Sequence, residues 1–546
     1  MNEKRKQISI TPQELLYYAF FIILLFAKGI GLYEGMLSFN ISILAALGCM
    51  AGALLLTDYT IKEWLGIIVA LVCSFMAYRI SGEKATIITV LVIVGMKNIP
   101  LDRIMKIAFT IWTITFYGML FVHLAGWKEE IVLAHNKFGL GFLLRHSLGF
   151  PHPNVLHISF VIWMALLLYV CKYTHKQLVK ISIWLAIENI FIFLFSISIT
   201  GLALGFMYLI LNYYFFVRKE LILVERVAIK AVLPVCILVS IIPPLLFQGR
   251  LFDILNKLLN TRMNIWKYYL TTFAPGILGT RVYSPESGVM SLDCSYLYLL
   301  YYYGIILFVA IMGLMYWTIS RYVKENRKEE LAIILGMLVA GIVEPYLFNF
   351  SFKNLILLFM GHELFKALKE KSDKRIVLFS FMKKEITLNL SQVKWNLLEK
   401  KSDLFEINQN LHGTNLYTTN AENQNTIKQL KKLCVITGVI IGVIAGIYTA
   451  ITYNKPEEIY VQTYRCDYVS GPGVTKEEIA DQENCWILGY QNEETRFYGF
   501  HGNMITLEYF RGIIANIVFG CCLGGGVIFI GSYMVTQTRN KNVRKV

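Results

Sequence analysis

The sequence predicts an all-α polytopic membrane protein, and three observations support this fold class. Of the 546 residues, 56% are hydrophobic and only 16% are charged, whereas soluble domains are about half apolar and about a quarter charged. The mean hydropathy is +0.54. The apolar residues form blocks of about 17 to 25 residues, the length that a helix needs to cross about 30 Å of hydrocarbon.

The apolar blocks number about twelve, followed by a C-terminal pair. The fourth block is short and the seventh and eighth nearly touch, so either pair can form a re-entrant or hairpin element instead of two crossings. In chain order the blocks cover residues 15–33, 39–57, 64–80, 85–96, 104–125, 155–171, 181–198, 199–217, 228–247, 293–320, 331–349 and 353–368, then 433–453 and 508–535.

Basic residues predict the orientation, because Lys and Arg beside a span stay in the cytoplasm. With a cytoplasmic N-terminus, every even-numbered connection carries basic residues and is cytoplasmic, and so is the C-terminus. We therefore expect a multi-pass protein of a bacterial cell membrane. The formal charge of +15 follows from this topology and from contacts with membrane lipids, so no nucleic-acid partner is expected.

Composition divides the chain into three parts. Residues 1–371 form the main membrane domain, residues 372–432 are polar and predict a cytoplasmic linker, and residues 433–546 predict a two-helix membrane module with a small outer loop. Cys466 and Cys485 lie in that loop and can form a disulfide, because it faces the oxidising side. No Cys pair has metal-ligand spacing, so a structural zinc site is not expected.

Two extracytoplasmic loops are long, residues 126–154 and 248–292, and loops of this length are usually functional or disordered. The first contains Arg145, His146, His152 and Asn154, with Pro151 and Pro153 restricting the backbone. One interpretation is a binding site. The alternative is a membrane-interface loop in which Arg145 pairs with lipid phosphate and the histidines cap the next helix.

The second long loop combines cations with aromatic rings. Guanidinium groups bind phosphate oxygens in pairs, and Trp and Tyr rings offer apolar faces for sugars. A lipid diphosphate in the outer leaflet is therefore the expected partner of the basic residues of both loops, which are Lys128, Lys137, Arg145, Arg250, Lys257, Arg262, Lys267 and Arg281.

Three acidic residues are candidates because charges at membrane depth are costly. Asp293 begins the tenth block, where it either helps to cap the helix or faces Arg262 or Arg281 across a polar cavity. Glu344 precedes Pro345 and can reach the same cavity, whereas Glu188 lies near mid-span and a structural hydrogen bond is at least as plausible for it. Buried carboxylates can serve as general bases.

Three segments of the chain resemble the Wzy-type O-antigen and capsule polysaccharide polymerase family, in particular its Gram-positive members. The resemblance covers roughly residues 10–370 and excludes the tail, which is loosely similar to chain-length regulators with a smaller loop. The segments are Leu148-Gly149-Phe150-Pro151-His152-Pro153-Asn154; Thr261-Arg262-Met263-Asn264-Ile265-Trp266-Lys267 with Gly276-Ile277-Leu278-Gly279; and Asp293-Cys294-Ser295-Tyr296-Leu297-Tyr298 with Tyr303-Gly304.

The resemblance implies metal-independent glycosyl transfer between undecaprenyl-diphosphate-linked oligosaccharides on the outer face, with a flippase and a chain-length regulator as further partners. It implies that Arg145, Arg262 and Arg281 bind diphosphate, with Lys267 and Asn154 nearby. His152 is the leading candidate for the base or for acceptor orientation, followed by Asp293 and Glu344. Trp266 and Tyr296 are expected to shape the sugar site.

One departure from the family pattern limits this transfer of roles. Relatives often have Ser-Arg-Thr-Gly between the seventh and eighth helices, where this chain has Ser198-Ile199-Thr200-Gly201, and Arg145 or Arg281 is expected to compensate. Two alternatives stay open. One is a ligase that transfers glycan from the lipid carrier to a surface acceptor, and the other is a flippase or exporter of the lipid-linked unit, although no internal repeat typical of transporters is present.

Overall fold

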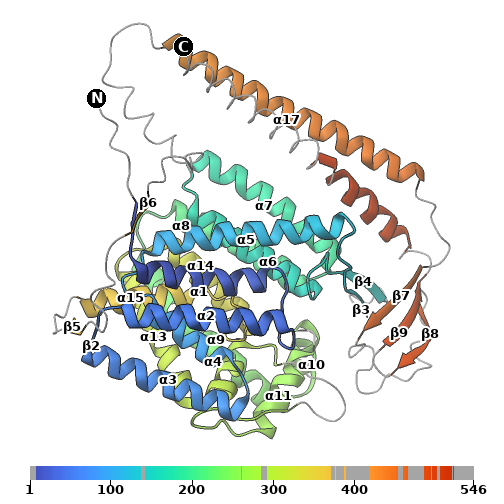
Figure 1. Ribbon diagram of the computed structural model, residues 1–546. Coiled ribbons are helices and arrows are strands. Elements are labelled where there is room, and N and C mark those ends of the chain that lie inside the picture. Colours follow the sequence, from blue (N-terminus) through green and yellow to red (C-terminus); the bar gives the residue numbers. More distant parts are fainter. Residues whose placement is uncertain are drawn as a thin grey trace. The chain divides into compact units, whose positions relative to one another are not determined.

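The computed structural model contains a helical unit and a smaller second unit (Figure 1). Unit 1 comprises residues 1–123 and 147–393, and unit 2 comprises residues 124–146 and 394–546. The structure describes residues 8–136, 142–259, 261–283, 292–369, 375–376, 386–388, 417–452, 459–464, 485–492, 495–500, 505–518 and 520–521.

Every predicted block contains a helix, and the all-α fold class is confirmed. In unit 1 the helices are α1 (Pro12–Gly29), α2 (Leu37–Leu56), α3 (Ile61–Ser81), α4 (Ala85–Gly95), α5 (Leu101–Leu124), α6 (Pro153–Val170), α7 (His175–Ser196), α8 (Ile199–Val217), α9 (Leu223–Leu246), α10 (Gly249–Leu258), α11 (Arg262–Thr272), α12 (Ser295–Tyr298), η1 (Leu299–Tyr303), α13 (Gly304–Lys324), α14 (Lys328–Val343) and α15 (Ile356–Lys369).

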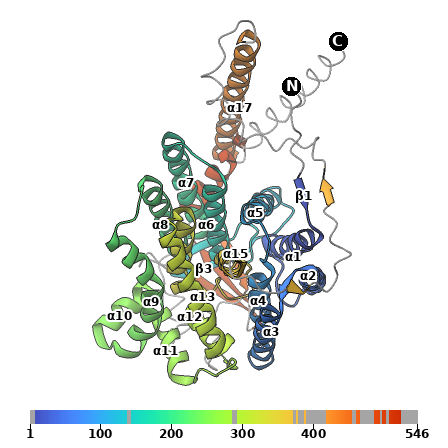
Figure 2. The same cartoon turned by 90° about the vertical axis from the view of Figure 1, so that its left-hand side faces the viewer.

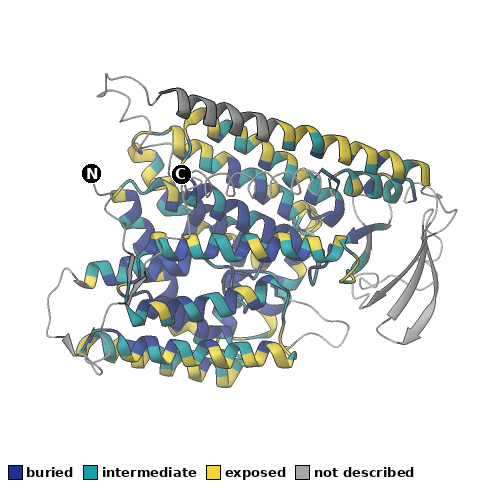
Figure 3. Cartoon of the chain, turned by 45° about the horizontal axis from the view of Figure 1, so that its top comes forward, coloured by how far each residue is buried: buried dark blue, intermediate teal, exposed yellow. Residues whose placement is uncertain are grey.

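Within the described part of the chain, nine helices are long and apolar enough to cross a membrane. They are α2, α3, α5, α6, α7, α8, α9, the stretch Ser295–Lys324 formed by α12, η1 and α13, and the apolar part Leu433–Thr452 of helix α17 (Tyr417–Thr452). Large apolar side chains such as Leu44 and Ile210 are exposed on these helices, and Figure 3 shows exposed residues on the outside of the helices and buried ones between them. This pattern suits a lipid environment, and a multi-pass membrane protein is the class that it supports.

The predicted count of about twelve crossings is met only in part, because α1, α4, α14 and α15 do not meet the criteria of a candidate span. Helix α4 has 11 residues, about 16 Å at 1.5 Å per residue, which is too short to cross. Its residues are almost all buried. Figure 2 shows α15 among the helices of unit 1, and it contacts α4, α13 and α14.

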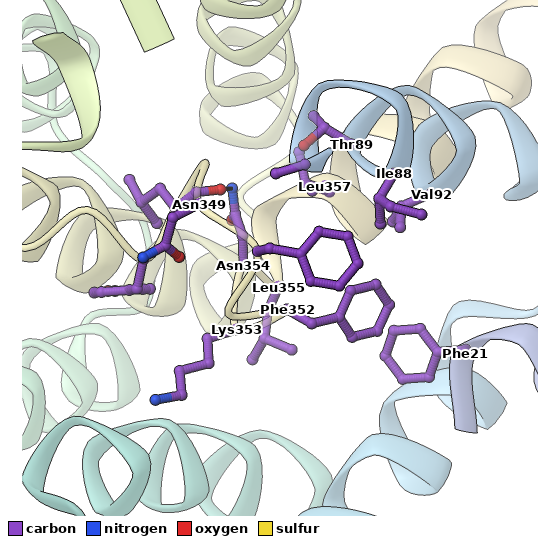
Figure 4. Close-up of a pocket in the computed structure, with 14 residues that line it drawn as sticks. Phe21, Ile88, Thr89, Val92, Asn349, Phe352, Lys353, Asn354, Leu355 and Leu357 are labelled. Atoms are coloured by element: carbon purple, nitrogen blue, oxygen red, sulfur yellow. Dashed lines mark hydrogen bonds between the residues drawn. The ribbon is translucent and has the colours of Figure 1, made fainter. Parts of the chain in front are cut away.

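The segment between α14 and α15, residues 344–355, is not helical, although the blocks predicted helix as far as 349 and again from 353. Pro345 disfavours helical geometry at the preceding residue, and Glu344 is extended, with φ −138° and ψ 139°. Non-helical backbone at membrane depth must be buried in protein or line a cavity. This segment does both, because most of its residues are buried and several of them line a small hollow (Figure 4).

The seventh and eighth blocks form a helical hairpin of two full-length helices joined by Ile197 and Ser198. Ile197 has a left-handed φ of 45°, and the Ser198 hydroxyl accepts a hydrogen bond from the Gly201 amide at 3.3 Å. A Cβ on Gly201 would overlap the ring of His157 in α6. Gly201 is therefore needed for close packing of α8 against α6.

A second close approach breaks the α12–η1–α13 helix at Gly304, which has a φ of 80°. The loop at Gly276 to Gly279 fills the break. The Ile305 amide donates to the Gly276 carbonyl at 3.0 Å, and the Ile306 amide donates to the Ile277 carbonyl at 3.2 Å. Two segments of the family resemblance, Gly276–Gly279 and Tyr303-Gly304, thus form one structural feature.

Unit 2 contains strands that the sequence analysis did not predict. Strands β3 (Val132–Asn136) and β4 (Phe142–His146) form an antiparallel hairpin from the first long loop, and β7 (Ile459–Tyr464), β9 (Thr495–Phe500) and β8 (Cys485–Asn492) form a sheet in the order β7-β9-β8. The helices are α17 (Tyr417–Thr452) and a helix at residues 505–518. Strand β7 contacts β3, so the first long loop belongs with the C-terminal segments in one unit.

Candidate functional site

Three charged side chains of unit 1 meet where three structural elements begin or end. Nη2 of Arg262 lies 3.5 Å from Oδ2 of Asp293 and 3.5 Å from Oε1 of Glu344. The expectation that Asp293 faces Arg262 and that Glu344 reaches the same place is therefore confirmed. We call Arg262, Asp293 and Glu344 the Arg262 cluster.

Local structure explains this convergence. Arg262 is the first residue of α11 and follows Thr261, which has a left-handed φ of 67°. Asp293 lies two residues before α12, and Glu344 directly follows α14. The hydroxyl of Ser295 joins the last two elements, because it donates to the Glu344 carbonyl at 2.6 Å and accepts from the Leu347 amide at 3.3 Å.

The cluster is largely buried but reaches the surface at one point. The side chains of Arg262 and Glu344 are 9% and 12% exposed, and that of Asp293 is 27% exposed. In such a place the charges depend on one another, because removal of one partner leaves a buried charge uncompensated. Asp293 is the member of the cluster that is most accessible from outside.

Two buried N–H groups beside the cluster lack acceptors. Among the residues that the structure describes, neither Nε of Arg262 nor Nε1 of Trp266 has a hydrogen-bond partner, and Trp266 is fully buried. The two residues are four positions apart in α11 and therefore share one helix face. A buried donor without an acceptor costs about 1–3 kcal/mol, so this face favours a ligand rich in acceptor oxygens.

Three further residues predicted for the site, Tyr296, Lys267 and Arg281, make other contacts or lie exposed. Tyr296 is a core residue whose hydroxyl donates to the Leu338 carbonyl at 2.6 Å, so it has a packing role. The ammonium of Lys267 lies 5.1 Å from the centre of the Phe252 ring, a cation–π contact. Arg281 is exposed. No hydrogen bond or ion pair between described residues joins Arg281 to Arg262.

His152 caps helix α6 in this structure. Its Nδ1 accepts a hydrogen bond from the Asn154 amide at 3.0 Å, and Pro153 occupies the first turn, the position at which Pro is favoured. This is the structural interpretation that the sequence left open. Leu148 and Gly149 have positive φ values of 46° and 84°, so the preceding segment is a tight turn.

Unit 2 contains a separate charged cluster around His146. Nδ1 of His146 lies 2.8 Å from Oε1 of Glu130, and Nε2 lies 2.9 Å from Oε2 of Glu508. Arg511 pairs with Glu508, and its Nη1 donates to the Leu144 carbonyl at 3.0 Å. Burial lowers the pKa of His146, but the hydrogen bonds to both carboxylates outweigh burial and raise it to about 9. His146 is therefore a cation at neutral pH. Arg145, its neighbour, is buried in the same hairpin.

Two further charged residues lie within apolar stretches of the sequence, and only one of them, Glu188, was predicted. Glu188 accepts a hydrogen bond from the Tyr117 hydroxyl at 2.7 Å, which confirms the structural interpretation. Lys353 was not predicted. It is 6% exposed and lies in the non-helical 344–355 segment. The signal for it was a charge next to Asn354 within an otherwise apolar run.

No group of three or more His, Cys, Asp or Glu side chains that could hold a metal ion occurs among the described residues. The predicted disulfide lies outside them: Cys466 is not described, and Cys485 is described only as the start of β8.

The fold and the Arg262 cluster define a class, a multi-pass helical membrane protein with a charged cluster where helices end. Comparison with protein-family models, with curated proteins and with solved structures finds no match for this chain.

Proposed function

We propose that this protein is a glycosyltransferase of the cell membrane that joins undecaprenyl-diphosphate-linked oligosaccharide repeat units into a capsular or related polysaccharide. The observation that carries this proposal is the buried guanidinium of Arg262 between Asp293 and Glu344. Its own Nε and the Nε1 of Trp266 have no acceptor among the described residues. Such a site suits a diphosphate attached to a sugar, because phosphate oxygens accept from guanidinium groups.

The transfer requires one bond to form and one to break. The acceptor hydroxyl oxygen bonds to the anomeric carbon of the donor sugar, and the bond from that carbon to the diphosphate oxygen breaks. The electron pair leaves with the lipid diphosphate, whose charge Arg262 stabilises. The hydroxyl proton passes to a carboxylate.

Asp293 is the better candidate for that carboxylate, because it is the most exposed member of the cluster. Glu344 is more buried and orients the guanidinium of Arg262. The role of base thus moves from His152, which caps α6, to Asp293. The transfer is redox-neutral and uses no metal or other cofactor.

The arrangement of the family-like segments supports the proposal. Arg262 of the second segment meets Asp293 of the third, and the Gly276–Gly279 loop packs into the helix break at Gly304. Segments far apart in sequence thus build one region. In this proposal the site faces outward, both termini are cytoplasmic, a flippase supplies the substrate and a chain-length regulator is a further partner.

The test uses cells in which the chain is replaced by Arg262→Ala or Asp293→Asn. Lipid-linked saccharides are extracted and sized, and single repeat units are expected to accumulate while the variant protein is still detected in the membrane, with polymer compared per amount of inserted protein. The matched control is Arg103→Ala, which removes a guanidinium paired with Glu14 at 3.0 Å elsewhere in unit 1 and should leave polymer intact.

The same experiment separates the alternatives. A ligase would leave full-length glycan on the lipid carrier, and a flippase would leave single units on the inner leaflet, protected from an added hydrolase. Normal polymer in both site variants would exclude the proposed function.

A further inference from the structure

Helix α10 carries apolar residues on one face and leaves them exposed. Leu251, Ile254 and Leu258 are three or four positions apart and therefore share a face, and these residues are 52%, 55% and 76% exposed. None of the ten residues of α10, all of which the structure describes, is buried. Figure 2 shows the helix at the edge of unit 1, next to α11. A contiguous exposed apolar face of this kind indicates a binding partner.

The opposite face of α10 is charged. Arg250, Asp253 and Lys257 are also three or four positions apart, and all three are exposed. A helix with leucine and isoleucine on one face and basic residues on the other is typical of helices that lie in the plane of a membrane surface, with the apolar face about 5–10 Å deep. The ten residues of α10 extend over about 15 Å, which is too short to cross a bilayer.

The apolar face of α10 continues the exposed surface of a candidate span. Helix α9 is long and apolar enough to cross a membrane, and its last residues, Leu245 and Leu246, are exposed like those of α10. Only two residues separate the helices. Gln248 is extended and Gly249 has a left-handed φ of 59°, a value that glycine adopts without strain, so α10 does not prolong α9 as one longer helix. It begins where a spanning helix ends.

Helix α10 is also joined to α11, the helix that begins with Arg262. Oδ1 of Asn256 accepts a hydrogen bond from the Asn264 amide at 3.1 Å, and the Asn256 carbonyl accepts one from the Thr261 amide at 2.8 Å. A cation–π contact also connects the two helices. The depth of α10 in a membrane therefore fixes the depth of Arg262 as well.

We propose that α10 lies in the surface layer of the membrane on the side of the Arg262 cluster, with its apolar face among the acyl chains and with Arg250 and Lys257 among the phosphates of the lipid head groups. The partner of this face is thus the bilayer itself. Burial of the apolar face and attraction of the cations to anionic lipids both stabilise this position. Helix α10 then holds α11 at the level of the head groups, whether or not the protein transfers sugars.

The test places the photo-reactive residue benzoylphenylalanine at one position at a time in the full chain. The chain is reconstituted in vesicles of phosphatidylglycerol and phosphatidylethanolamine, irradiated and analysed by mass spectrometry. Ile254 and Leu258 probe the apolar face and Asp253 probes the charged face. We expect several-fold more acyl-chain adducts at Ile254 and Leu258 than at Asp253. The reference position is Ile210, which is 68% exposed on the candidate span α8.

The same irradiation identifies the other possible occupants. Cross-links from Ile254 and Leu258 to a second copy of the chain, or to another segment of the same chain, would overturn the inference. Equal lipid labelling of both faces would overturn it too, and so would unlabelled Ile254 and Leu258 in vesicles where Ile210 is labelled. All these positions are exposed, so the substitutions should preserve the fold, which size exclusion checks.

A second measurement removes the apolar face. Ile254→Asp together with Leu258→Asp should release α10 from the bilayer, because carboxylates are costly among acyl chains. Hydrogen exchange of α10 in vesicles should then be several-fold faster than in the wild type, with exchange of α8 unchanged. The matched control is Asp253→Asn on the charged face, which should exchange as the wild type does. Unchanged exchange of α10 in the double variant would contradict the inference.

Discussion

The guanidinium of Arg262 lies 3.5 Å from the carboxylate of Glu344, although 82 positions separate the two residues in the chain. Arg262 begins α11 and Glu344 follows α14, so the contact joins the second long loop to the non-helical segment that also carries Lys353. We expect that removing either partner lowers the stability of this region and impairs the proposed reaction, and these two effects can be measured separately.

Arg262→Ala should destabilise the purified protein by roughly 1–3 kcal/mol, because it leaves two carboxylates close together without their cation. The double variant Arg262→Met with Glu344→Gln removes one charge of each sign and should recover much of this loss without recovering polymer formation. Thermal unfolding in detergent and polymer analysis in cells provide the two measurements. Recovery of polymer in the double variant would show that Arg262 is structural.

Gly304→Ala should prevent correct folding of the α12–η1–α13 region. A Cβ at this position would overlap the backbone nitrogen of Gly279, and a φ of 80° disfavours any other residue. The protein should reach the membrane in much reduced amount, as measured by fluorescence-detected size exclusion. Gly313→Ala in the same helix is the control, since nothing lies within 4 Å of its Cβ position, and it should behave as wild type.

His146 should make the stability of unit 2 depend on pH. Its pKa is about 9 when folded and ordinarily 6.5, so the contribution is complete below about pH 6.5 and is lost as the pH rises towards 9. Hydrogen exchange of the β3–β4 hairpin, corrected for intrinsic base catalysis, should accelerate over this range. His146→Gln should exchange fast at every pH, and a wild-type hairpin equally protected at pH 6 and pH 9 would contradict the assignment.

Helix α17 and the helix at 505–518 should depend on small residues for their packing. A Cβ on Gly442 would overlap Cys521 Sγ, and one on Gly446 would overlap the side chain of Ile517, an arrangement typical of closely packed membrane helices. Gly442→Leu should therefore separate the pair, detected as loss of a disulfide between cysteines introduced at Thr449 and Asn516, whose side chains bond at 2.9 Å. Gly512→Leu has open space around its Cβ position and should keep the cross-link.

Hydropathy predicted the helices well because a spanning helix is determined locally, by the length of an apolar run. It missed the end of α14, since Leu347, Phe348 and Phe350 continue the apolar run through a non-helical segment. That segment is held by side chains distant in sequence, such as Ser295 and Tyr303, and no local pattern reports such bonds.

The site was predicted in part for a related reason. Arg262, Asp293 and Glu344 could be found because charges beside membrane spans are unusual and costly. His152, the leading candidate for the base, caps α6 through its Nδ1, and its role as a base stays a prediction. The His-Pro pair at a helix start was itself a capping signal, and the structure uses it in that way. Arg145 and the first hairpin lie with the C-terminal segments in unit 2, a long-range association that the sequence does not reveal.

The most direct test reconstitutes the reaction. Lipid-linked single repeat units are isolated from Arg262→Ala cells and incubated with the purified wild-type chain in detergent, and both chain length and released lipid diphosphate are followed. Longer saccharides on the lipid carrier are predicted, with one lipid diphosphate released for each bond formed, and none with purified Arg262→Ala protein. Equal elongation by the variant, or release of lipid diphosphate without elongation, would contradict a polymerase that depends on Arg262.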